Sequence, residues 1–355
     1  MGRTSLLGQD SNAAEIFDVV HARILRFFPE LVDQLGGDAK LLMRQVGFDS
    51  EYLSEGKSGS TYRQMVHLIE LAAAELRSPD FGMRLATLQG GGGMFGPLGL
   101  VMKNSRTFGD ALDYVSKHIY AHSLAARVWL QRSGYRKAVF VGHDILLDRM
   151  PNKCQAMEQL LLVGHLAAME ITGGLSRVRK VHFRHQPVSS LRTYGRNFGC
   201  EVRFGQNEDG VFFSERDLAC PIIDPDSQAY RAATSFIDAR FTRHRPPLHA
   251  QARGVIRQFL GTDNCTNDRI AAALNLHPRT MHRRLNAEGT SFQQIKDEVR
   301  RDLLLYYLQQ TNLNFALVSA RLGFAEQSVM TRSCNRWFSA SPTKLRSQRR
   351  LALTD

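Results

Sequence analysis

The sequence predicts an α+β fold. An N-terminal α+β domain, in which helices precede a small antiparallel sheet, is followed by an all-α domain with two helix-turn-helix units joined by a connector helix. Three observations predict it. Apolar residues recur at helical spacing through residue 88, strand-like alternation begins near residue 126, and a pair of short helical segments occurs twice near the C-terminus.

The first part of the chain is predicted to be helical. Its clearest helix, Thr61–Leu76, places Tyr62, Met65 and Leu68 on one side. Further helices are expected over residues 12–35 with a break at Pro29, 39–53 with an end at Gly47, and 107–120. The glycine-rich stretch 89–99 predicts a flexible hinge or loop. It is a poor phosphate-binding loop because no Lys-Ser/Thr pair follows it.

Strands are predicted in the middle of the chain. One β-hairpin is expected around Ser133-Gly134, and a second joins Cys200–Phe204 to Gly210–Phe213. Another strand is expected at 180–184. Three helices are expected at 155–171, 191–198 and 226–241. The pair Pro246-Pro247 predicts a linker over 243–250, so that the domains are 1–242 and 251–350.

Two helix-turn-helix units are predicted at about 268–289 and 316–338. Their apolar positions correspond at offsets of 48 or 49 residues: Ile270, Leu274, Met281 and Leu285 in the first, and Val318, Leu322, Met330 and Cys334 in the second. Asn275 and Gly323 stand at the turns, where a left-handed backbone conformation is expected. The second helix of each unit is then available for the DNA major groove.

The outward faces of these second helices carry hydrogen-bond donors suited to base edges and phosphates. The predicted DNA-binding residues are Arg279, Thr280, His282 and Arg283 in the first unit, and Gln327, Ser328, Thr331 and Arg332 in the second. The predicted connector lies within Ser291–Gln309, and its 18 residues from Phe292 to Gln309 span roughly 27 Å at about 1.5 Å per residue. Successive major-groove faces lie about 34 Å apart, so a rigid connector could place the two units on adjacent turns of the duplex.

Charge is concentrated in the same region. Residues 250–355 contain 16 Lys and Arg against 8 Asp and Glu, a net charge of +8 out of the +12 of the whole chain. A basic domain binds phosphate through counterion release. No apolar run is long enough for a membrane span and no signal peptide is evident. The five scattered cysteines without CxxC spacing indicate reduced thiols in a cytoplasm and no metal cluster.

The C-terminal region resembles the DNA-binding domain of the AraC/XylS family of bacterial transcription regulators. The matching stretches are LNLHPRTMHRRLNAEGTSF, DEVRRDLLLYYLQQT and RLGFAEQSVMTRSCNRWFSASP. Ser339 stands where the family usually has glycine, and Met330 and Cys334 fill the apolar aromatic positions of the last helix. The N-terminal part resembles the "arabinose-binding-like" effector domain of the ornithine-utilisation type of regulator, with a jelly-roll sugar-binding fold as the alternative.

The resemblance implies a ligand-responsive, sequence-specific regulator, expected to be an activator. Its expected partners are double-stranded DNA, a small-molecule effector of unknown identity, RNA polymerase and a second copy of the chain; no cofactor, metal or membrane is expected. The alternatives are a DNA-targeted enzyme and an architectural protein without sequence preference. DNA-repair methyl acceptors of similar type need a Pro-Cys-His motif, which Cys154, Cys200 and Cys220 lack.

Other candidate sites in the N-terminal part are weaker. His118 and His122, four residues apart on a predicted helix, could present two metal ligands, but no third ligand is evident. Asp144 and Asp148 are best read as solvated carboxylates. Aromatic residues that would either line an effector pocket or belong to the core are Phe95, Tyr114, Trp129 and Phe140.

Overall fold

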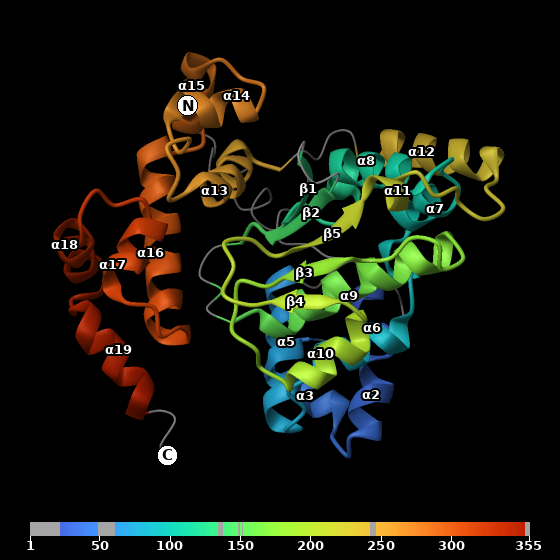
Figure 1. Cartoon of the computed structure of the whole chain (residues 1–355), viewed down its shortest axis with the longest axis horizontal. Coiled ribbons are helices and arrows are strands. Elements are labelled where there is room, and N and C mark those ends of the chain that lie inside the picture. The colour runs from blue at the N-terminus through green and yellow to red at the C-terminus, as the bar shows by residue number, and fades with distance from the viewer. Residues whose placement is uncertain are drawn as a thin grey trace, which may run out of the picture. The chain divides into compact units, whose positions relative to one another are not determined.

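The computed structural model describes residues 22–48, 61–133, 138–147, 150, 152–241 and 246–351 of the 355-residue chain. The chain divides into two compact units. The first comprises residues 1–145 and 152–246, and the second comprises residues 146–151 and 247–355. Each unit has its own arrangement of elements (Figure 1).

The first unit contains a five-stranded sheet in the order β1-β2-β5-β3-β4. The strands are β1 (Ala126–Ser133), β2 (Ala138–Ile145), β3 (Lys180–His182), β4 (Glu201–Arg203) and β5 (Gly210–Ser214). The β1–β2 hairpin was predicted correctly, although residues 134–137 of its turn lie outside the described residues.

The predicted second hairpin is wrong. β4 pairs in parallel with β3, while β5 pairs antiparallel with both β2 and β3, so the sheet is mixed rather than purely antiparallel. Long-range pairing decides this arrangement. β5 lies between β2 and β3, and Val211 is opposite both Val141 and Val181. In this position the backbone groups at both edges of β5 are paired with neighbouring strands.

Helices pack against the sheet and make up most of the first unit (Figure 1). They are α2 (Phe28–Gln34), α3 (Ala39–Gln45), α5 (Tyr62–Glu75), α6 (Phe81–Gln89), α7 (Pro97–Lys103), α8 (Phe108–His118), α9 (Cys154–Ile171), α10 (Leu191–Phe198), α11 (Glu215–Leu218) and α12 (Ser227–Phe241), with 3-10 turns at η1 (Ala22–Leu25), η2 (Gly92–Phe95) and η3 (Ile119–Ala121). The early helices confirm the helical periodicity of the sequence. Residues 12–21 and 49–60 of the predicted helices lie outside the described residues.

The long helix α9 forms the centre of the first unit. Its residues are buried on nearly every side, which is the expected position of a helix that is apolar all round. Gln155 accepts a hydrogen bond from the backbone N–H of Gly82 (2.8 Å) and donates one to the carbonyl of Pro79 (2.8 Å). These bonds satisfy a buried amide and join α9 to α6.

The glycine-rich stretch 89–99 is more ordered than a flexible hinge. It contains the 3-10 turn η2 and the first residues of α7, which begins at Pro97. Proline suits this position because the first turn of a helix needs no backbone N–H.

The second unit is entirely helical among its described residues. It contains α13 (Leu248–Phe259), α14 (Asn267–Ala273), α15 (Pro278–Ala287), α16 (Phe292–Gln310), α17 (Phe315–Arg321), α18 (Gln327–Phe338) and α19 (Pro342–Leu351). The boundary between units falls inside the predicted linker 243–250, but Leu248 to Ala250 already belong to α13. Residues 243–245 lie outside the described residues.

Candidate DNA-binding surface

The first helix-turn-helix consists of α14 and α15. Thr266 begins α14 by accepting a hydrogen bond from the N–H of Arg269 (3.3 Å). Asn275 then adopts the predicted left-handed conformation with φ 55°, and the N–H of Leu276 bonds to the carbonyl of Ala271 (2.9 Å). Pro278 occupies the first turn of α15. Local signals alone therefore account for both ends of this turn.

The second helix-turn-helix, α17 and α18, repeats the design. Asn314 caps α17 by accepting from the N–H of Leu317 (2.8 Å), and Gly323 takes the left-handed conformation with φ 64°. Ser339, at the family's usual glycine position, also has a left-handed backbone with φ 51°. The conformation at the end of α18 is thus retained without the residue that adopts it most easily.

One face of each second helix is buried in a shared core. Met281 and Leu285 of α15 and Met330 and Cys334 of α18 have no exposed surface. They belong to one apolar cluster with Ile295, Val299 and Leu304 of α16 and residues of α13, α14 and α17. Burial raises the pKa of the Cys334 thiol to about 11, so this cysteine is an uncharged packing residue. The shared core fixes which faces of α15 and α18 meet solvent.

The predicted DNA-binding residues lie on those outer faces. Six are exposed: Arg279, His282, Arg283, Gln327, Ser328 and Arg332; Thr280 and Thr331 are half-buried. Two hydroxyls have local partners, since Thr331 donates to the carbonyl of Gln327 (3.0 Å) and Ser328 donates to Glu326 (3.0 Å). The side chains of Arg279, Arg283 and Arg332 have no ion-pair partner within residues 246–351, so their guanidinium groups are available to an anionic ligand.

Further polar residues extend the same faces. Arg284 and Asn286 of α15 and Asn335 of α18 are exposed, although they were not among the predicted residues. Arg284, Asn286 and Asn335 lie four residues after the predicted residues Thr280, His282 and Thr331, respectively. Extending the outward face by one helical turn would therefore have identified them from the sequence.

The connector helix α16 is bonded to both units. Lys296 donates to the carbonyl of Cys265 before α14 (2.9 Å). Arg300 donates from Nε to the carbonyl of Leu322 (3.0 Å) and from a second nitrogen to that of Gly323, and its guanidinium lies 4.4 Å from the ring centre of Phe324. Burial lowers the pKa of Arg300, but the neighbouring Asp297 (3.7 Å) opposes this effect. The second turn is thus held against α16 by a partly desolvated cation.

α13 completes the second unit. Glu288, just after α15, accepts from the backbone N–H groups of Leu248 (2.9 Å) and His249 (2.8 Å) at the start of α13. A carboxylate there satisfies otherwise unpaired N–H groups and complements the helix dipole. Arg253 of α13 forms ion pairs with Glu298 and with Asp302 (3.6 Å) of α16. This helix was not predicted, yet it fixes α15 relative to α16.

The weaker candidate histidines lie in different elements of the structure. α8 ends at His118, whose imidazole stacks on Tyr114 (3.9 Å), while His122 lies beyond η3 and packs against Phe95 (5.6 Å). The two histidines therefore do not share a helix face. Over the described ranges, no group of three or more His, Cys, Asp or Glu residues is arranged to hold a metal ion. Asp144 is buried and pairs with Lys153 (3.2 Å), whereas Asp148 lies outside the described residues.

The four aromatic pocket candidates separate in the structure. Phe95 lines a cavity in the first unit. Trp129 and Phe140 pack against each other (6.3 Å) with Trp129 lying over Gly142, and Tyr114 contacts Tyr230 of α12 (6.3 Å). Tyr114, Trp129 and Phe140 thus do not line that cavity. None of the helices in the described part of the chain is both long enough and apolar enough to span a bilayer.

Comparison with known proteins agrees with this architecture. Residues 36–222 match the family described as the arabinose-binding domain of AraC transcription regulators, N-terminal, and residues 270–348 match a helix-turn-helix domain family. The regulator VirS of Mycobacterium tuberculosis is 30% identical over 334 residues, which cover 94% of this chain and 98% of VirS. The ornithine utilization regulator of Pseudomonas aeruginosa is 24% identical over 345 residues, which cover 94% of this chain and 97% of that regulator.

A third relative matches a shorter part of the chain. The urease operon transcriptional activator of Escherichia coli is 35% identical over 83 residues, 23% of this chain and 28% of that activator. The expectation of a regulator rather than an enzyme is confirmed by the named function of these relatives. With an effector-type domain followed by two helix-turn-helix units on one core, this chain belongs to the AraC family of transcription regulators.

Proposed function

We propose that this regulator reads two successive major-groove segments, using Arg279, Thr280, His282 and Arg283 for one, and Gln327, Ser328, Thr331 and Arg332 for the other. The observation that supports this most directly is the common core: α15 and α18 each bury one face in it and expose the opposite face. The connector α16 has 19 residues, or roughly 28 Å at about 1.5 Å per residue. That length is close to the ~34 Å between major-groove faces one turn apart.

Arginine has a specific role in this scheme. Its guanidinium can donate two hydrogen bonds to the O6 and N7 atoms of guanine, which is the commonest base-specific contact. Arg283 and Arg332 are exposed and have no ion-pair partner among residues 246–351, so neither must break an internal bond to reach a base. We assign them as the principal base readers of α15 and α18.

The experiment compares Arg283→Ala with Arg269→Ala. Arg269 is an exposed arginine of α14, outside the proposed reading helix, so both variants lose one positive charge from the same helix-turn-helix. DNA ligands are selected from a random library by the full chain, and affinities for the selected site and its single-base variants are then measured. Arg283→Ala is expected to lose about 1–3 kcal/mol and to relax preference at one base pair. Arg269→Ala is expected to weaken all sequences alike.

Two results would remove Arg283 from the reading role: unchanged base preference in Arg283→Ala, or the same relaxation in both variants. If the unaltered chain bound every sequence equally, with only salt-dependent affinity, the architectural alternative would replace sequence-specific reading. Footprints of Arg283→Ala and Arg332→Ala test the two-segment arrangement, because protection should weaken at different halves of the site.

The regulatory assignments complete the proposal. Residues 1–242 form the effector and dimerisation domain, and 251–350 form the DNA-binding domain. The chain acts in the cytoplasm as a homodimeric activator that contacts RNA polymerase; the named activator among its relatives supports the sign of regulation. An effector must bind two arrangements of the chain with different affinity in order to shift their populations. DNA binding measured against protein concentration tests the dimer, and occupancy of one site by a strict monomer would contradict it.

A further inference from the structure

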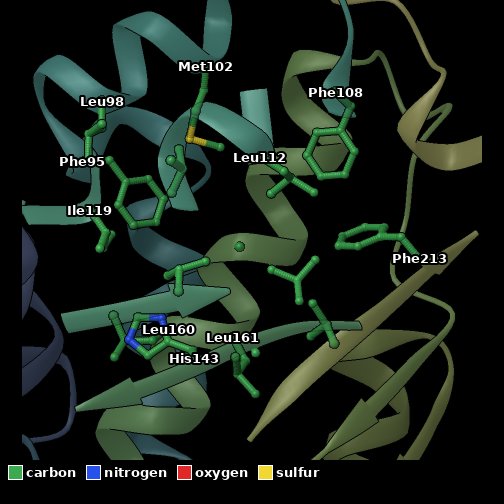
Figure 2. Close-up of a pocket in the computed structure, with 16 residues that line it drawn as sticks. Phe95, Leu98, Met102, Phe108, Leu112, Ile119, His143, Leu160, Leu161 and Phe213 are labelled. Atoms are coloured by element: carbon green, nitrogen blue, oxygen red, sulfur yellow. The ribbon is translucent and has the colours of Figure 1, made fainter. Parts of the chain in front are cut away.

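The first unit contains a partly enclosed apolar cavity of about 80 Å³. One wall is the sheet, through Val128 of β1, Val141 of β2 and Val211 of β5; the others are α7, α8 and α9 (Figure 2). Its aromatic and sulfur-containing lining consists of Phe95, Met102, Phe108 and Phe213. Small-molecule sites are usually concave and mostly apolar, with a small number of polar groups that orient the ligand.

His143 of β2 is the only lining residue with a polar side chain. Its Nε2 atom is buried and has no hydrogen-bond partner, and no side-chain hydrogen bond of this imidazole occurs within the described part of the chain. Burial lowers the pKa of His143 to about 4, so the ring is neutral near pH 7 and offers one donor and one acceptor. Buried polar groups in native proteins are nearly always paired, so this nitrogen lacks the partner that a ligand would supply.

We propose that this cavity is the effector site and that the effector is a small apolar molecule with one hydrogen-bonding group, which pairs with His143. The inference rests on the proposed function of the chain as an effector-responsive regulator. It adds the location of the effector site and the chemical class of the effector.

Cavity size limits the apolar part of the molecule. An engineered apolar cavity of about 150 Å³ holds benzene, and this cavity is about half that size. The ligand is therefore a short aliphatic chain or a single ring, and a ring enters with rotamer changes in the lining. Met102 is suited to this because its unbranched thioether adapts readily to the shape of a neighbour.

Cavity chemistry excludes a sugar. A pentose carries four hydroxyl groups, and His143 could pair with only one or two of them. The remaining hydroxyls would lie unpaired against valine, leucine and phenylalanine side chains, which is strongly unfavourable. The family description names arabinose, but this chain has no polar cradle for arabinose at this cavity.

The cavity is also connected to the end of the first unit. α7 forms one of its walls, and α12 packs against α7. Asp226, just before α12, donates its backbone N–H to the side chain of Asn104 at the end of α7 (2.9 Å). α12 ends at Phe241, where the chain continues to the linker. A ligand that moves α7 would thus change the position of the element that leads to the DNA-binding unit.

Gly164 of α9 provides a direct test. It lines the cavity, and a Cβ at this position would meet no atom within 4 Å. Gly164→Leu therefore fills the cavity, and leucine also favours a helix more than glycine does. Gly195 of α10 is the matched control: it is a helical glycine with equally open surroundings, but it is exposed and does not line the cavity. His143→Leu removes the polar anchor and keeps an apolar side chain.

Binding of benzyl alcohol, toluene and L-arabinose to the full-length variants is measured by calorimetry and thermal shift. The unaltered chain and Gly195→Leu are expected to bind both ring compounds and not arabinose. Gly164→Leu should weaken both ring compounds at least ten-fold. His143→Leu should weaken benzyl alcohol about ten-fold, the effect of one buried hydrogen bond, and leave toluene within about two-fold.

Three results would overturn the assignment: no binding of either ring compound, unchanged binding by Gly164→Leu, or binding of arabinose that Gly164→Leu abolishes. Selection of specific DNA by each variant is scored separately. A chain that selects a specific site but fails the ligand tests retains the proposed regulatory function and loses only the cavity assignment, whereas loss of selective DNA binding in the unaltered chain would contradict the function itself.

Discussion

Replacing Arg300 by methionine should uncouple the connector helix from the second helix-turn-helix. Only 13% of this side chain is exposed, and its guanidinium bonds to the carbonyl oxygens of Leu322 and Gly323 at the turn after α17. Carbonyl groups at the C-terminal end of a helix such as α17 have no partner within the helix. Methionine preserves the apolar stem of the side chain and removes every hydrogen bond.

The magnitude follows from three contributions. A hydrogen bond from a charged donor contributes about 1.5–3 kcal/mol, and the cation–π contact with Phe324 adds about 0.5–1 kcal/mol. Removing the buried cation relieves its desolvation, the same effect that lowers the pKa of Arg300, and the exposed Gly323 carbonyl can bond to water. We expect a net loss of about 2 kcal/mol, which at a slope of about 2 kcal/mol per molar shifts a urea midpoint by about 1 M.

The assay is urea unfolding followed by the fluorescence of Trp337. The chain has two tryptophans. Trp337 packs near Phe324 in the second unit (6.3 Å), so a Trp129→Phe background isolates that unit. Arg301→Met is the control, because Arg301 is the next residue of α16 and makes an ion pair with Asp302 at 3.7 Å. An ion pair between partly exposed side chains such as these contributes about 0–1 kcal/mol. Equal midpoint shifts for the two variants would refute the role assigned to Arg300.

Three other perturbations have expected outcomes. Burial lowers the pKa of His143 to about 4, so the unfolded chain binds a proton at higher pH than the folded chain. The free energy of unfolding should therefore decrease by up to about 3 kcal/mol as pH falls from 6.5 to 4. In thermal melts, His143→Leu should remove this contribution to the pH dependence. Glu158 accepts a hydrogen bond from the Tyr194 hydroxyl (2.5 Å), and burial raises the pKa of its carboxyl group to about 8. The free energy of unfolding should therefore decrease as pH rises from 4.5 to 8. Glu158→Gln should be more stable than the unaltered chain at pH 8 and show no advantage at pH 4.5. Ser339→Gly should stabilise the second unit by about 1 kcal/mol in urea titrations, since glycine adopts the left-handed conformation without the steric cost that serine bears there; a loss of stability would show that the Ser339 side chain has a compensating contact.

Signals close together in the sequence predicted the DNA-binding region well. Asn275 and Gly323 have the left-handed backbone that the turns require, and Met281 and Met330 occupy the buried faces that the helical period assigns. Turn conformation, capping and the period of apolar residues depend on a few neighbouring residues, so they can be read directly from the chain. The same reasoning placed Arg283 and Arg332 on exposed faces.

The tertiary structure alone decided which strands are neighbours in the sheet and which residues line the apolar cavity. β4 lies beside β3 and not β5, because β5 is already bordered by β2 and β3, and no local residue pattern specifies which strands are neighbours. Likewise, His143 reads in the sequence as one polar residue in a strand. Its place in an apolar cavity depends on α7, α8 and α9 packing over the sheet from distant parts of the chain. The sequence by itself thus determined the local geometry of α15 and α18, whereas the apolar cavity and its one polar lining residue arise from contacts between residues far apart in the chain.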